Sequence, residues 1–560
     1  MWLGKLPSGS DTARTVTSLF NKRRSDRCFG LFGKTCSIDM QARNLAAILW
    51  QQGVPSRLKF KYHNAKAIEL SHSVDMQAGI ETGNRELDRA PRMLAELNRA
   101  PARTRINFLL LCLFLGTMLF FGGASRADVM SLPIVRLASV VMIAIALMQI
   151  DHQQWMVIRV PALFLLAVGA IVAIQLVPLP PQLWASFPGR ALYMDALRTA
   201  GIDGGWRPLS LTPDLTLNAL LALLPPLATV LALGLIGRIW QQLLIPLLLT
   251  VIGLNALVGL LQIASNTPYF YDITNQDAAV GFFSNRNHFA MLMAIGFPAL
   301  ACWAALPQGD PTRRRTRSWL ALCAAAALFP LLMTAGSRAG LMLGAIGAIA
   351  AFGIRMRRRS HATASNKGPW RPQLVMLIPL AVGAIAIVAT VALSRDVALS
   401  RILEGTGADQ RTANLPIYLT MAKDFFPVGA GFGSFESVFR IYEPAQSVTQ
   451  EYLNEAHNDL LQIIIEGGVS SAVLLALFLF WFIVRSWNLW WYKVRSPVEL
   501  LGRTGSVMAA LILLGSLVDY PLRTPWLSSL MAVACYWMLP GRSSGAEGSE
   551  AERGLAVLEA

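Results

Sequence analysis

The sequence predicts an all-α polytopic membrane protein with about 12 transmembrane helices and one large, partly helical loop on the periplasmic side. Three observations lead to this fold class. Hydrophobic residues make up 54% of the 560-residue chain and charged residues only 15%. In a soluble domain roughly a quarter of the residues are charged. The hydrophobic residues gather in runs long enough to cross a bilayer. Basic residues gather in short clusters between those runs, a pattern that orients membrane proteins.

The composition also excludes several classes of protein and site. The formal net charge is +16, but the basic residues are not gathered on one face and no nucleic-acid-binding motif accompanies them. We therefore expect no nucleic-acid partner. The six cysteines include no Cys-x-x-Cys pair, and none lies between residues 395 and 457. This pattern excludes a disulfide-bonded external domain and argues against a thiolate metal site.

Residues 1–105 form a basic, polar segment without an apolar run that could cross a bilayer. We expect this segment to be cytoplasmic, and it contains no recognisable domain. It also lacks the short apolar core of a signal peptide. Met76 or Met93 is an alternative start of translation, a hypothesis that peptides from before Met76 in the native protein would contradict.

The membrane domain is expected to cover residues 106–540, followed by a polar tail at 541–560. The lengths of its apolar runs are close to the ~20 residues that a helix needs to cross the hydrocarbon core. They cover approximately 106–123, 132–150, 159–179, 215–236, 241–264, 288–306, 318–335, 339–354, 373–393, 459–484, 504–519 and 524–540.

The loops between these runs predict the orientation of the chain. Arginines and lysines cluster at 313–317, 355–371 and 485–503. In a count of twelve spans, all three clusters fall on one side, which is the cytoplasmic side by the positive-inside rule. Both termini are then cytoplasmic, and the long loops 180–214, 265–287 and 395–457 lie on the opposite side.

Loop 395–457 is the longest of these external loops. Its apolar residues at helical spacing predict a partly helical cap on the outer face of the membrane: Leu415, Ile417, Tyr418, Met421, Ala422 and Phe425. Disorder of this loop is the alternative. We consider four aromatic side chains either as surfaces on which sugars stack or as ordinary interfacial aromatics, namely Tyr418, Tyr442, Phe435 and Trp206.

Two residues on the external side have functional and structural interpretations. Arg338, at the end of a span, is either an anion site, because a guanidinium fits phosphate oxygens, or a side chain that extends to the lipid headgroups. His457 is either a structural residue at a helix start or a base that titrates near neutral pH. After it, Asp459, Gln462 and Glu466 form one polar stripe, which must face protein or water.

Two further segments are polar or rich in glycine. Asn285, Arg286 and Asn287 precede a span, and at least one asparagine is expected to cap that helix. Gly429, Gly431 and Gly433 do not form a dinucleotide-binding pattern and follow no predicted strand. They predict a tight turn below the long loop.

Several short motifs in a fixed order resemble the O-antigen ligase/polymerase family over roughly residues 106–540. They are Trp206–Pro213, Gly281 with Asn285-Arg286-Asn287, Ser337-Arg338, Pro427–Phe435, Ala456–Gln462, Glu466-Gly467-Gly468 and Asp519–Pro525. Residues 1–105 lie outside the resemblance.

The resemblance implies an inner-membrane glycosyltransferase of the ligase or polymerase type. Its donor would be a glycan on a polyprenyl diphosphate such as undecaprenyl diphosphate, and its acceptor lipid A-core, a growing glycan or a protein hydroxyl. His457, Arg338 and Arg411 match the catalytic positions, Arg411 with the weakest surrounding match. Asn285, Arg286, Asn287 and Asn458 are expected to bind substrate. Arg286 stands where the family often has a small or neutral residue, which leaves its role open.

The implied reaction needs positive charge at the leaving diphosphate and a base at the acceptor. Direct attack would invert the anomeric centre, and no pair of carboxylates is placed for a covalent intermediate. The chain has no Asp-x-Asp motif, so we expect neither a metal ion nor another cofactor. One alternative is a polysaccharide or lipid-linked sugar transporter, which should show internal repeats and broken helices near mid-membrane. Another is an assembly protein without catalysis.

Overall fold

The computed structural model describes residues 101–359, 414–448, 453–491 and 496–540, apart from 266–267, 277, 308–310 and 446–447. The chain divides into two compact units, Met1–Arg85 and Glu86–Ala560, and all the described residues belong to the second. The N-terminal segment 1–100, the expected span 373–393, Arg411 and the C-terminal tail lie outside the described residues.

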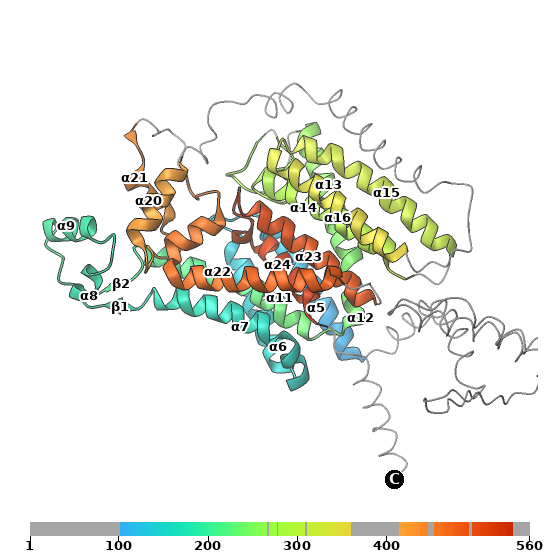
Figure 1. The fold of residues 1–560 in the computed structure, drawn as a ribbon, viewed down its shortest axis with the longest axis horizontal. Coiled ribbons are helices and arrows are strands. Elements are labelled where there is room, and N and C mark those ends of the chain that lie inside the picture. Colours follow the sequence, from blue (N-terminus) through green and yellow to red (C-terminus); the bar gives the residue numbers. More distant parts are fainter. Residues whose placement is uncertain are drawn as a thin grey trace, which may run out of the picture. The chain divides into compact units, whose positions relative to one another are not determined.

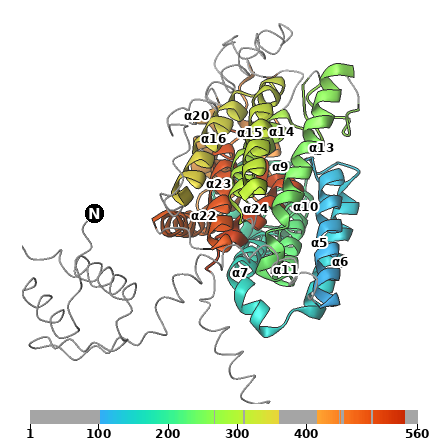
Figure 2. The ribbon, with the colours of Figure 1, turned by 90° about the vertical axis from the view of Figure 1, so that its right-hand side faces the viewer.

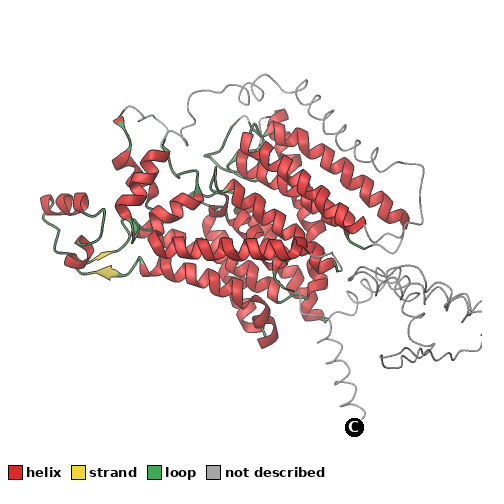
Figure 3. Ribbon diagram, in the orientation of Figure 1, coloured by secondary structure: helices red, strands yellow, loops and turns green. Residues whose placement is uncertain are grey.

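Long apolar helices dominate this part of the chain, as predicted for an all-α polytopic membrane protein (Figures 1 and 3). Ten of the helical segments described are long and apolar enough to cross a membrane. They are α5 (Ala102–Phe121), α6 (Leu132–Gln149), α7 (His152–Ile174), α10 (Pro213–Leu221) continued by α11 (Leu224–Gly234), α13 (Leu244–Ser265), α14 (Arg286–Ala305), α15 (Pro311–Thr334), α16 (Arg338–Arg359), α22 (Asp459–Trp491) and α23 (Pro497–Gly515).

These ten segments match ten of the twelve apolar runs of the sequence. Of the other two runs, 373–393 lies outside the described residues. The last run forms α24 (Pro525–Met538), a helix of 14 residues. At 1.5 Å per residue it is about 21 Å long, shorter than the ~30 Å hydrocarbon core. Helix α24 is buried throughout, so it belongs to the interior of the bundle.

Helix α14 is the centre of the bundle and packs against α13, α15, α16 and α23 (Figure 2). In the apolar stretch of α14, 94% of the residues are buried, whereas in the apolar stretches of α7 and α22 only 17% are buried. Glycines on α16 allow a close approach to its neighbours. A Cβ added at Gly340 would come within 2.3 Å of Ala290 on α14, and one at Gly344 within 2.4 Å of Leu332 on α15. Small residues at such interfaces let helix backbones approach closely in membranes.

The remaining elements are short and lie in the long loops and connections. They are β1 (Pro178–Leu179), α8 (Pro181–Ala185), α9 (Ala191–Thr199), β2 (Arg207–Pro208), α12 (Arg238–Gln241), α20 (Leu415–Phe425), α21 (Phe435–Tyr442) and η2 (Pro521–Arg523). Strands β1 and β2 pair antiparallel.

The expected partly helical cap is present in the described part of loop 395–457. Helix α20 covers the predicted apolar stripe and buries Tyr418, Met421 and Phe425. Together with Phe435 and Phe439 of α21, these side chains form a small core of their own. That core also includes Ala456 and Ile465, so it joins the cap to the first turns of α22.

Candidate functional site

The site forms where α22 begins, and the polar turn 455–458 leads into that helix. The side chain of Asn458 accepts a hydrogen bond from the backbone N–H of Leu461 at 3.1 Å. This bond satisfies one of the amide groups that a helix start leaves without a partner. Asn458 therefore caps the start of α22 through its side-chain oxygen.

Two turns further along, α22 is interrupted at Gly468, whose φ of 60° and ψ of −148° are not helical. The glycine-rich segment 427–433 packs against this interruption. The N–H groups of Ala430 and Gly431 donate to the carbonyls of Ile465 and Glu466, and Val469 N–H donates to the carbonyl of Pro427. Backbone groups released by the kink thus find partners, as buried polar groups must.

The predicted tight turn is confirmed at Gly429, Gly431 and Gly433, which all have positive φ. A side chain at Gly431 would overlap Ser210, and one at Gly433 would overlap Leu215. The segment 210–215 therefore packs directly on the turn. Gln175 links the same turn to α22, because it donates to the carbonyl of Glu466 at 3.0 Å and accepts from Phe432 N–H at 2.9 Å.

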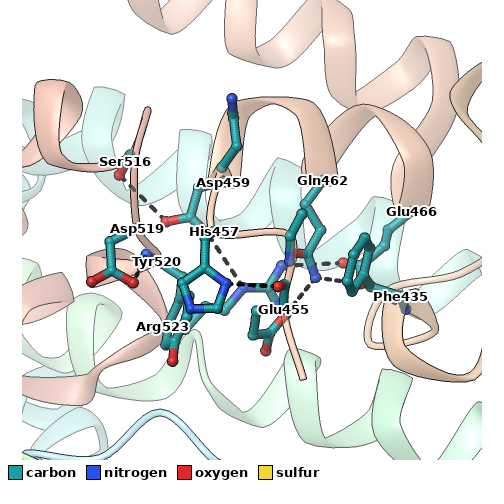
Figure 4. A network of polar contacts seen from close by, with 12 residues as sticks. Phe435, Glu455, His457, Asp459, Gln462, Glu466, Ser516, Asp519, Tyr520 and Arg523 are labelled. Carbon is teal, nitrogen blue, oxygen red and sulfur yellow. Dashed lines mark hydrogen bonds and ion pairs between the residues drawn. The ribbon is translucent and has the colours of Figure 1, made fainter. Parts of the chain in front are cut away.

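The predicted polar stripe of α22 faces protein, and its two carboxylates lie beside the guanidinium of Arg523 in η2 (Figure 4). Each guanidinium nitrogen of Arg523 lies near a different carboxylate. Nε is 3.2 Å from Asp459, Nη1 is 3.4 Å from Glu455 and Nη2 is 3.4 Å from Glu466. Asp459 and Glu466 are almost fully buried, where ionised carboxylates are stable only with such partners.

Gln462, the middle residue of the stripe, completes this network. Its amide nitrogen donates to the carboxylates of both Glu455 and Glu466, and its oxygen accepts from Ala456 N–H at 2.8 Å. Asp459 additionally accepts from the Ser516 hydroxyl at 3.3 Å, and its N–H donates to the Ser516 carbonyl at 2.8 Å. The turn 455–458 is thereby attached to α22 at several points.

His457 lies in this turn with a φ of 51°, a left-handed conformation that is uncommon for residues other than glycine, although asparagine, aspartate and histidine adopt it more often than the rest. Its Nδ1 is 2.9 Å from the backbone carbonyl of Glu455. The ring packs edge to face on Tyr520, with 4.9 Å between centroids. A carbonyl can only accept a hydrogen bond, so this contact requires the proton on Nδ1 and leaves the lone pair of a neutral ring on Nε2.

Asp519, the residue before Tyr520, binds two asparagines at the start of α14, the N-cap Asn285 and Asn287 of the first turn. Its carboxylate accepts from the side chain of Asn285 at 3.2 Å and of Asn287 at 2.7 Å. The Oδ1 of Asn285 caps α14 by accepting from Asn287 N–H at 2.8 Å, which confirms the expected cap. Asn287 in turn accepts from the hydroxyl of Ser337 at 2.7 Å, the residue before α16.

Arg338 is the first residue of α16 and is exposed. Arg286, the first residue of α14, extends toward the same place, because its Nη1 is 3.9 Å from the position that a Cβ on Gly336 would occupy. Two arginines therefore stand at the N-terminal ends of two neighbouring helices. Helix N-termini carry partial positive charge, which adds to the charge of the guanidinium groups.

Burial and charge shift the titration of groups in this network. Burial raises the pKa of Glu455 to about 7, and the nearby Glu466 and Asp459 add to this shift against the opposing effect of Arg523. Burial alone would lower the pKa of Arg523, but the carboxylates of Glu455, Glu466 and Asp459 outweigh it and hold the pKa above its usual range. Arg523 is therefore a permanent cation.

The structure thus connects most of the predicted site residues through direct contacts. His457 touches Tyr520, whose neighbour Asp519 binds Asn285 and Asn287. Asn287 binds Ser337, which precedes Arg338. Arg411 lies outside the described residues.

Sequence reasoning did not assign roles to Glu455, Asp519, Tyr520 and Arg523. The signal was the motif Asp519–Pro525, an acidic and a basic residue in a short proline-bounded connection. The interpretation of Tyr418 and Phe435 as sugar-stacking surfaces is wrong, because both are buried in the core of the cap, with 2% and 1% exposure. Trp206 is 67% exposed, and Tyr442 donates a hydrogen bond to Asp424.

Among the described residues, no group of three or more histidine, cysteine, aspartate or glutamate side chains is arranged to hold a metal ion. The carboxylates that do converge here surround the guanidinium of Arg523.

Comparison with known proteins bears on this site. Residues 323–476 match the family model described as O-antigen ligase, which confirms the resemblance to the O-antigen ligase/polymerase family seen in the sequence motifs. The matched region includes Arg338, Arg411, His457 and the kink at Gly468. None of the curated proteins compared with the chain matches it.

Proposed function

We propose that this polytopic membrane protein, with its O-antigen ligase domain, is a glycosyltransferase of cell-surface polysaccharide synthesis. It moves a glycan from a polyprenyl diphosphate, such as undecaprenyl diphosphate, to an acceptor hydroxyl on lipid A-core, a growing glycan or a protein. The proposal includes a location in the inner membrane with both termini cytoplasmic and the site on the periplasmic side. The family match and the helices able to span a membrane support it.

The observation that carries the proposal is the geometry of His457. A neutral imidazole with its proton on Nδ1, held by the carbonyl of Glu455, presents an unprotonated Nε2. That nitrogen accepts the proton of an acceptor hydroxyl as a general base. The Tyr520 ring limits the rotation of the imidazole, so the base is already oriented before substrate binds.

The donor diphosphate is proposed to bind at the N-terminal ends of α14 and α16. Arg286 and Arg338 supply positive charge there, and helix N-termini favour phosphate binding. Arg411 is proposed as a further cation at the same diphosphate. Asn285, Asn287 and Asn458 complete the binding site, with Asn285 and Asn287 oriented by Asp519.

The proposed reaction is a single displacement. The acceptor oxygen forms a bond to the anomeric carbon while the bond from that carbon to the diphosphate oxygen breaks. His457 takes the hydroxyl proton, and the arginines stabilise the charge on the departing lipid diphosphate. The configuration of the anomeric carbon inverts. A retaining route would need a carboxylate nucleophile, but Glu455, Asp459 and Glu466 are held by Arg523.

The proposal is tested with purified protein, a polyprenyl-diphosphate-linked glycan and an acceptor in liposomes. We expect transfer of the glycan that continues at an unchanged rate in excess EDTA, because arginines rather than a metal ion neutralise the diphosphate. Product formation is followed by mass spectrometry. Movement of the lipid-linked glycan across the bilayer without transfer would favour a transporter, and loss of activity in EDTA with recovery in magnesium would refute the metal-independent reaction.

Replacing Arg338 tests the diphosphate site. We expect Arg338→Gln to lower kcat/KM for the donor about 100-fold, in the range found when one group that stabilises developing charge is removed. The kcat/KM of Arg338→Lys should lie between those of Arg338→Gln and the wild type, because lysine keeps the charge but lacks the planar guanidinium group. Initial rates at varied donor concentration measure this. Arg198→Gln, an exposed arginine on α9, is the control, and equal effects of the two glutamine variants would contradict the assignment.

A further inference from the structure

Arg523 has an unusual role for a single side chain, because it contacts carboxylates on both sides of His457 in the sequence. Glu455 lies two residues before the histidine and Asp459 two residues after it, and both are within 3.4 Å of the guanidinium. Glu466, two turns after Asp459 on α22, lies near the third nitrogen. Figure 4 shows these side chains converging beside the imidazole.

The same short connection also contributes the ring that packs on the imidazole. Tyr520 lies three residues before Arg523 and packs its ring on His457. The backbone of Glu455, the residue that Arg523 holds by its carboxylate, accepts the hydrogen bond from the imidazole. The connection 519–523 therefore fixes both the residue that orients the ring and the residue on which the ring packs.

We infer that Arg523 is the positioning residue for His457 in the proposed transfer reaction. It fixes the turn 455–458 through Glu455 and Asp459, and so keeps the histidine in its left-handed conformation with Nε2 oriented toward the acceptor. Arg523 does not touch substrate in this arrangement. This inference rests on the proposed function of His457 as a base.

The geometry of the contacts explains why the position needs arginine. The nitrogens of a guanidinium point in fixed, different directions, whereas an ammonium group is a compact point charge on a flexible chain. Lysine at 523 would keep the charge among the carboxylates and so avoid leaving them buried without a cation. It would not hold three of them at once, and the turn would lose its fixed geometry.

Arg523→Lys is therefore the informative variant. We expect kcat to fall about 10- to 100-fold, because a displacement of about 1 Å of a reacting group costs up to that much. KM for the donor should stay within about twofold of the wild-type value, in contrast to Arg338→Lys, which should raise it. Arg440→Lys, in an exposed ion pair with Glu436, is the matched control and should leave both constants unchanged.

A double variant separates positioning from a general loss of structure. If Arg523 acts through His457, then Arg523→Lys should not lower the residual rate of His457→Asn any further, because groups that act as a unit are not additive. If the two reductions multiply, Arg523 acts on the fold as a whole and the inference is overturned.

Glu455→Gln provides a second route should Arg523→Lys fail to fold. It keeps the size of the side chain but weakens the contact with Arg523, and we expect a roughly 10-fold lower kcat with the same lack of additivity toward His457→Asn. Wild-type kcat in the folded Arg523 or Glu455 variant, while His457→Asn is inactive, overturns the inference and leaves the proposed function standing. An active His457→Asn overturns the base and the positioning role together.

Discussion

Replacing His457 by asparagine should lower the rate of glycan transfer about 1,000-fold, within the range that a general base contributes. Asparagine is chosen because His457 has a φ of 51°. Asparagine tolerates this left-handed region better than alanine, so the turn should keep its conformation. Its amide cannot take up a proton near neutral pH, so the variant removes the base with little effect on the backbone.

The measurement is the initial rate of transfer with purified protein, beside the melting temperature in detergent. We expect the melting temperature of His457→Asn to lie close to that of the wild type. His152→Asn is the matched control, because His152 is exposed at the start of α7 and should be replaceable without loss. A folded His457→Asn protein with more than a tenth of the wild-type rate would rule out the base.

Replacing Gly468 by alanine should destabilise the protein strongly. The added Cβ would come within 2.1 Å of the carbonyl oxygen of Pro427, and the φ of 60° is unfavourable for any side chain. With a ψ of −148°, Gly468 lies in a region of backbone conformation that is essentially restricted to glycine, and a side chain there costs about 1–3 kcal/mol. Overpacking of a close interface costs typically about 1–3 kcal/mol more. We therefore expect the free energy of unfolding to fall by about 2–6 kcal/mol, together with separation of the glycine-rich turn from α22.

Gly253→Ala is the control for this variant. Gly253 lies in the helical segment α13, and a Cβ there meets no atom within 4 Å, so alanine should be neutral or slightly stabilising. Thermal unfolding and the yield of monodisperse protein in detergent measure both variants. Equal stability of Gly468→Ala and Gly253→Ala would mean that the kink in α22 is not required by the fold.

These two replacements affect different parts of the same site. His457→Asn removes a chemical group and should leave the left-handed backbone conformation of the turn unchanged, whereas Gly468→Ala alters the backbone that holds the glycine-rich turn against α22. We expect His457→Asn to lower the transfer rate but not the free energy of unfolding. Gly468→Ala should lower both. This difference separates the chemistry of the site from its support.

The sequence by itself determined the elements of this protein, because their signals are local. Ten of the apolar runs form helices long and apolar enough to cross a membrane, since a helix satisfies its own backbone polar groups in lipid. The apolar spacing of residues 415–425 became α20. The stripe Asp459, Gln462 and Glu466 had to face protein, and the structure buries all three.

Only the tertiary structure decided which groups meet. Asp519 binds asparagines more than 200 positions away, and Arg523 completes the stripe of α22 from a different connection. The kink at Gly468 within an apparently continuous apolar run is likewise set by the turn that packs on it. Periodicity reports which face of a helix is buried, but the partner on that face depends on how the helices pack, and no local pattern contains that information.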